Sequence, residues 1–194
     1  MMSRRAKLFI IFGVVVVSGF FGIYLLDGFA SIPEAFVQAR LQGALIAANI
    51  VKLSGETAID LEEINALDRS RDYKAAIELT SSLITKSREI REEAVRLSAE
   101  TERMTRALSD IKSFEARQAA LEAISNHLAL LSRLINYSAS LGKLMETLQA
   151  RFAGARTEYR ITQLVSDINA EVIAINAFSE QATQAMERFD AVTK

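Results

Sequence analysis

The residue types that carry most enzymatic chemistry are scarce in this chain of 194 residues. The only histidine is His127, which lies between Asn126 and Leu128 in a leucine-rich stretch, and the sequence has no cysteine. A single histidine without thiols leaves a tetrahedral zinc site short of ligands, and a di-iron carboxylate bundle requires Glu-x-x-His pairs on two helices. A structural role for His127 within a helix is therefore favoured over a catalytic one.

The sequence also lacks the short motifs that bind nucleotides or activate a serine. It contains no GxxxxGK phosphate loop, no GxGxxG dinucleotide fingerprint and no GxSxG nucleophile elbow. We therefore predict no catalytic, cofactor-binding or metal-binding residue, no cofactor, and a protein that is not an enzyme.

Asparagines are the remaining polar candidates for contact with a ligand. Asn49, Asn126 and Asn136 fall within predicted helices, where they could hold a small molecule between neighbouring helices. Asn169 and Asn176 are seven residues apart beside the last predicted apolar seam. They lie either inward, where a buried amide fixes helix register, or on the solvated rim.

The charge distribution argues against nucleic acid as a partner. The chain has 23 basic and 24 acidic residues, and its first seven positions hold three of the basic residues and none of the acidic ones. The remainder is mildly acidic and has no clustered basic face, whereas nucleic-acid binding requires a basic patch that neutralises phosphates.

The first predicted element is an uncharged stretch of 19 residues, LFIIFGVVVVSGFFGIYLL, which begins at Leu8 and ends at Leu26. A helix of this length spans about 28 Å, close to the hydrocarbon core of a bilayer at about 30 Å. Basic residues precede it at positions 4, 5 and 7, and Asp27 follows it. This asymmetry predicts a single-pass signal-anchor in residues 1–30, with the N-terminus cytoplasmic and residues 31–194 extracytoplasmic.

A cleaved signal peptide is the alternative interpretation of the same stretch. Gly28, Phe29 and Ala30 fit a small-x-small cleavage site, so the body would then be exported after cleavage near Ala30. The apolar run is longer than that of most signal peptides, which favours the anchor. Ser18 and Gly22 form a small-xxx-small pair that would let two such spans approach closely.

The rest of the chain is predicted to be all-α, because it contains one proline and few glycines. A first helix is expected to start with Ser31 as its cap and Pro33 in its first turn. We expect it to end near Leu53, where Gly55 suits a left-handed closing residue, and a short helix to follow over residues 60–70.

Three longer helices follow, and their apolar spacing alternates between three and four residues. The first starts at Asp72, the second follows a cap at Ser113 and is closed by Gly154, and the third starts near Thr157. The second is predicted to bury Leu121, Ile124, Leu128, Leu131, Ile135, Ser138, Leu141, Met145, Leu148 and Phe152.

Residues 71–79, RDYKAAIEL, resemble the opening of the second helix of a tetratricopeptide repeat. The preceding stretch lacks that family's tryptophan and Leu-Gly pair, and no second copy follows at a spacing of about 34 residues. Tyr73 is therefore interpreted as the first core residue of a long helix. The whole outline is similar in architecture to the extracytoplasmic helical sensor domains of bacterial receptors, which normally return through a second span to a cytoplasmic signalling module.

The sequence therefore predicts an N-terminal transmembrane helix followed by an antiparallel bundle of three long helices plus one or two shorter ones. We expect a structural or protein–protein interaction role in the cell envelope, with the bilayer contacted through residues 8–26. Several predicted core positions are Ser, Thr or Ala, so a protein partner or self-association is expected to add stability. The alternative is a ligand-sensing helical domain that signals through an associated membrane protein.

Overall fold

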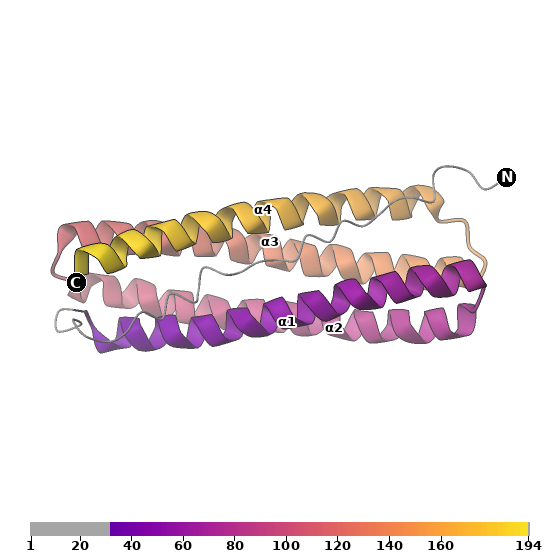
Figure 1. Ribbon diagram of the computed structural model, residues 1–194, viewed down its shortest axis with the longest axis horizontal. Helices are drawn as coiled ribbons and strands as arrows, with labels where there is room; N and C mark the ends of the chain where they lie inside the picture. Colours follow the sequence, from indigo (N-terminus) through magenta and orange to yellow (C-terminus); the bar gives the residue numbers. More distant parts are fainter. Residues whose placement is uncertain (1–31, 194) are drawn as a thin grey trace.

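The computed structural model describes residues 32–193, and over this range the chain is an elongated bundle of antiparallel helices without a strand (Figure 1). Successive helices run side by side in opposite directions, so the start of the first and the end of the last lie at the same end of the bundle (Figure 1). The helices are α1 (Glu34–Ser70), α2 (Tyr73–Ala107), α3 (Phe114–Phe152) and α4 (Glu158–Thr193), with a 3-10 turn η3 (Leu108–Asp110) after α2.

The predicted membrane span at residues 8–26, the cleavage site near Ala30 and the Ser31 cap lie outside the described residues. The described part of α1 begins after Pro33, which has no side-chain capping bond. Among the helices of residues 32–193, none combines the length and the apolarity that a bilayer crossing requires. The all-α prediction is confirmed for this range.

The connections between helices follow the turn chemistry of the sequence. The Asp72 side chain accepts a hydrogen bond from the backbone N–H of Ala75 at 3.2 Å and caps α2. Ser113 caps α3 in the same way, because its Oγ accepts from the N–H of Ala116 at 3.3 Å. Gly154 follows α3 with a φ of 97°, a left-handed conformation that glycine adopts without steric cost. The predicted start at Asp72, the Ser113 cap and the closing role of Gly154 are thus confirmed.

The predicted end of the first helix near Leu53 is wrong, because α1 continues through Gly55 to Ser70 as one helix of 37 residues. The bundle therefore has four long helices in place of three long and one or two short ones. Beyond Gly55, Asp60 of α1 accepts a hydrogen bond from Lys86 of α2 at 2.7 Å, and the same lysine lies 3.4 Å from Glu56. Packing of both halves of α1 along α2 outweighs the roughly 1 kcal/mol that a helical glycine costs.

Within residues 32–193, the buried apolar side chains form two clusters. The smaller lies where α1 and α3 begin and where α2 and α4 end, and in it the rings of Phe36 and Phe189 are 5.1 Å apart. It is rich in alanine, which lets the helices approach closely; its alanines are Ala39, Ala107, Ala116, Ala119, Ala120, Ala123 and Ala185. The larger cluster fills the rest of the bundle, with Tyr137, Leu83 and Ile175 fully buried at its centre.

The predicted core face of α3 is wrong at two of its leucines. Leu121 and Leu128 are 54% and 51% exposed, whereas His127, Leu130 and Leu134 are buried. α3 packs between α2 and α4, so its buried face is wide. Alanines and His127 occupy core positions on this face that the spacing of the leucines did not predict. Tyr73 is likewise outside the core: it is 42% exposed and stacks on Phe152 at 5.8 Å.

Candidate interaction surface

The structure does not bring the three candidate ligand-binding asparagines together. Asn49 of α1 lines a surface cavity of about 360 Å³ between α1 and α2. Asn136 is exposed on α3, where its Nδ2 donates to Glu171 of α4 at 3.4 Å, and Asn126 is half-buried on the same helix. One of the three predicted ligand contacts therefore lines this cavity, while the other two belong to α3.

The cavity beside Asn49 is charged and open to solvent. Arg96 donates to Glu93 across 2.8 Å within its wall, and residues 32–193 contain no group of three or more His, Cys, Asp or Glu placed to hold a metal ion. Organic ligands usually occupy sites lined mainly by apolar side chains. The lining residues are Asn49, Lys52, Leu53, Glu56, Glu89, Glu92, Glu93 and Arg96.

His127 is held deep in the bundle, with 4% of its surface exposed. Desolvation, and secondarily the positive charge of Arg40, lowers the pKa of His127 to about 4. Its imidazole is therefore neutral at physiological pH and shielded from solvent. This burial supports the structural interpretation of His127, because an acid or base must reach the group with which it exchanges a proton.

An uncharged surface runs along the outer side of α3. Its side chains recur at alternating spacings of three and four residues, all are exposed, and none carries a charge. We call this set the α3 outer stripe; it consists of Gln118, Leu121, Ser125, Leu128 and Ser132. Such spacing places the five on one side of the helix, with two half-exposed leucines separated by small or uncharged polar residues.

Two charged residues beside the α3 outer stripe, Glu122 and Arg133, are engaged with α4. Glu122 pairs with Arg188 at 2.6 Å, and Arg133 lies 3.6 Å from Glu171. These two ion pairs draw the charged side chains toward α4 and away from the stripe. The stripe itself therefore remains free of charge over about four turns of α3.

The outer side of α2 has the opposite character. It is dominated by charged side chains, several of which pair within the helix, as Arg103 does with Glu100 at 3.3 Å and Arg106 with Glu102. The exposed charged residues of its second half are Arg88, Glu89, Arg91, Glu92, Arg96, Glu102, Arg103 and Arg106. The outer side of α2 is therefore a charged, solvated surface, in contrast to the uncharged α3 outer stripe.

The α3 outer stripe was absent from the sequence-based predictions because Leu121 and Leu128 were assigned to the core. A signal for it exists in the sequence, since Glu122 is the only Asp, Glu, Lys or Arg between positions 118 and 132. Comparison of the chain with models of known protein families, with curated proteins and with solved structures gave no match in any of the three.

Proposed function

We propose that this chain is a membrane-anchored protein that acts by protein–protein contact, with residues 8–26 as its span and the bundle on the extracytoplasmic side. Its contact surface is the α3 outer stripe, and its partner is a second copy of the chain. The observation that carries the proposal is the exposure of two leucines seven residues apart, Leu121 and Leu128, on an uncharged stripe of α3. Exposed apolar surface rimmed by polar residues is typical of interaction sites.

A second copy fits this surface because the stripe carries no charge. When identical faces meet around a two-fold axis, the same patch of each copy meets itself, so a face dominated by one sign of charge repels its copy while an uncharged face does not. Two copies anchored in one membrane share an orientation, and their α3 helices then run parallel. The small side chains of Ser125 and Ser132 permit a close approach, as Ser18 and Gly22 would within the span.

The anchor and the orientation are tested on the full chain in native membranes. We expect the protein to resist extraction at alkaline pH, and a protease site placed after Lys194 to be cleaved only from the extracytoplasmic side. Release of the chain by alkaline extraction would overturn the anchor. Cleavage from the cytosolic side would overturn the orientation.

The pairing is tested by disulfide trapping, for which the absence of cysteine from the chain is an advantage. Ser125→Cys places a thiol in the α3 outer stripe, and Ser98→Cys places one at an exposed position on α2 as the matched control. Under mild oxidation in membranes, we expect the first variant to form a covalent dimer and the second to stay monomeric. Equal cross-linking of the two variants, or none from Ser125→Cys, would contradict pairing through this stripe.

A ligand-sensing domain is the second candidate, favoured by the cavity of about 360 Å³ beside Asn49, which lies within the size range of small-molecule sites. Its test is the thermal unfolding of the full chain in detergent against a panel of metabolites. A ligand that raises the unfolding temperature of the wild-type chain, but not of an Asn49→Leu variant, would favour sensing through this cavity. If no metabolite raises the unfolding temperature, the result would argue against ligand sensing and in favour of the protein–protein contact role.

A further inference from the structure

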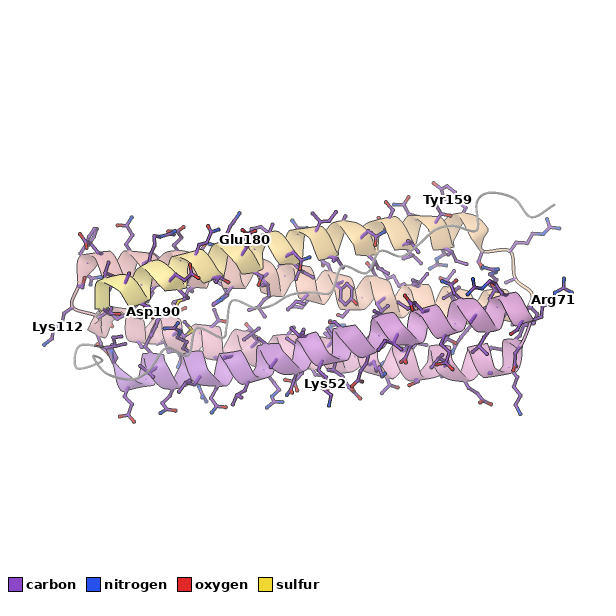
Figure 2. The ribbon with its side chains drawn as sticks, in the orientation of Figure 1. Lys52, Arg71, Lys112, Tyr159, Glu180 and Asp190 are labelled. Carbon is purple, nitrogen blue, oxygen red and sulfur yellow. The ribbon has the colours of Figure 1, made fainter. Side chains whose placement is uncertain are left out.

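The described chain starts at the end of the bundle that also holds the turn between α2 and α3. Ile32 belongs to the same apolar cluster as Ile111 of that turn and Phe36 of α1. Figure 2 places Lys112 and Asp190 at this end, and Arg71 and Tyr159 at the opposite one. The chain therefore leads back from this end of the bundle, through residues 27–31, to the proposed span at residues 8–26.

Chain length ties this end closely to the proposed membrane span. Five residues, 27–31, separate Leu26 from Ile32. At 3.3–3.6 Å per residue, the six steps between these two positions reach at most about 22 Å. The polar layer of a bilayer adds roughly 6 Å to each side of the hydrocarbon core. The turn between α2 and α3 thus lies within reach of the lipid headgroups.

An exposed aromatic side chain occupies this turn. Phe114 is the first residue of α3 and is 70% exposed, and Lys112 lies two residues before it, also exposed. Interfacial membrane-binding segments combine apolar side chains such as Phe, which enter the boundary between headgroups and acyl chains, with Lys, whose ammonium group stays among the headgroups.

The turn is not a cationic patch, because Asp110 and Glu115 are exposed beside Lys112. A contact made here depends on burial of the ring rather than on attraction to anionic lipid. It should therefore form on zwitterionic phosphatidylcholine as well as on acidic lipid.

We infer that Phe114, with Lys112 beside it, enters the headgroup layer of the membrane and gives the bundle a second lipid contact that holds it upright over its anchor. The inference rests on the membrane anchor of the proposed function, and it is independent of pairing through the α3 outer stripe. We assign the lipid surface as the partner of this exposed ring because only five residues, 27–31, connect the bundle to the proposed span.

Tyr159 provides a matched control at the far end of the bundle. It is 86% exposed and lies in the first turn of α4, which has 36 residues. A helix of this length extends about 54 Å. In an upright bundle, Tyr159 is therefore far from the lipid although it is an exposed aromatic residue like Phe114.

The experiment uses the full chain, which contains no tryptophan, in phosphatidylcholine vesicles with or without bromine on the upper acyl chain. Phe114→Trp and Tyr159→Trp each introduce one fluorophore at an exposed position. We expect the Phe114→Trp emission to be blue-shifted and quenched by brominated lipid, and the Tyr159→Trp emission to match that of a fully hydrated indole without quenching. Far-UV circular dichroism and thermal unfolding equal to wild type show that each variant is folded.

Absence of quenching at Phe114→Trp in a chain that resists alkaline extraction would overturn this inference and leave the anchor standing. Equal quenching of both variants would overturn the upright orientation, because it would place the bundle flat on the membrane. A chain that does not integrate into the vesicles would instead contradict the anchor of the proposed function.

Discussion

Arg40 of α1 and Asp190 of α4 form a two-pronged ion pair, in which the two guanidinium nitrogens lie 2.6 and 2.7 Å from the two carboxylate oxygens. The residues are 150 positions apart in the sequence and meet near the end of the bundle where Figure 2 labels Asp190. α1 and α4 are the first and last helices of the bundle, so no turn of the chain joins them. The ion pair therefore helps to hold together two helices that no turn joins.

Loss of this ion pair should destabilise the bundle. Arg40→Met removes the bidentate interaction and leaves Asp190 partly buried without its partner; the two side chains are 16% and 27% exposed. We expect the free energy of unfolding to fall by about 1–3 kcal/mol, since a half-buried carboxylate without a partner carries a desolvation cost. Chemical denaturation of the full chain in detergent measures this change.

Arg106→Met is the matched control, because Arg106 pairs with Glu102 on the surface of α2, where both side chains are more than half exposed. We expect Arg106→Met to lower the free energy of unfolding by no more than about 0.5 kcal/mol, the usual contribution of an exposed ion pair. Equal losses for Arg40→Met and Arg106→Met would show that the contact between α1 and α4 contributes no more than a surface ion pair.

Two glycines should respond to alanine in opposite directions. A Cβ added at Gly55 meets no atom within 4 Å, and this residue lies inside α1, so Gly55→Ala should stabilise the protein by about 0.5–1 kcal/mol. Gly154 also has open space around it, but its φ of 97° is one that alanine rarely adopts. Gly154→Ala should therefore lower the free energy of unfolding by about 1–2 kcal/mol.

Neither added methyl group meets a neighbouring atom. The difference in stability between the two variants therefore reports the effect of backbone conformation and not of steric clash. Thermal unfolding of both variants beside the wild type checks the signs. A destabilised Gly55→Ala would contradict the continuous α1 and would favour the break that the sequence predicts at this position.

The ends of the helices were the part of the fold most open to prediction. Asp72 and Ser113 cap through their own side chains and Gly154 turns the chain in a left-handed conformation, and such effects depend on a few neighbouring residues. The break near Gly55 was predicted on the same local grounds and is wrong. There, contacts between residues far apart in the sequence, such as Lys86 with Asp60, outweigh the local preference.

The rotation of α3 could not be predicted from its own leucines. Leu121 and Leu131 are equally apolar, yet one is 54% exposed and the other 4%. Which of them faces inward depends on where α2 and α4 lie, and therefore on the whole bundle. The α3 outer stripe escaped prediction for the same reason, because recognising it requires the buried face of α3 to be known first.

Two leucines of α3 test this rotation directly. Leu134→Ala removes a fully buried side chain and should lower the free energy of unfolding by about 2–5 kcal/mol, because it leaves a cavity in the core. Leu128→Ala truncates a side chain that is 51% exposed and should cost less than about 1 kcal/mol. Denaturant titration of both variants provides the comparison, and a larger loss at Leu128 than at Leu134 would restore the predicted core face.

Burial of His127 should make the stability of the bundle depend on pH between its folded and unfolded pKa values. In the folded chain, desolvation and then the charge of Arg40 lower the pKa of His127 to about 4, while the unfolded chain titrates near the ordinary value of about 6.5. Below pH 6.5 the unfolded state takes up a proton that the folded state does not. Acidification therefore favours unfolding, and this effect levels off below about pH 4.

The size of the effect follows from the same two values. We expect the contribution of His127 to fall by about 2 kcal/mol between pH 7 and pH 4.5, as measured by denaturant titration at each pH. His127→Leu keeps a side chain of similar volume at this buried position and removes the titration, so the wild-type curve minus the variant curve isolates the histidine from the carboxylates. A difference that does not change with pH would show that water or a compensating charge reaches the imidazole, which would contradict its burial beside Arg40.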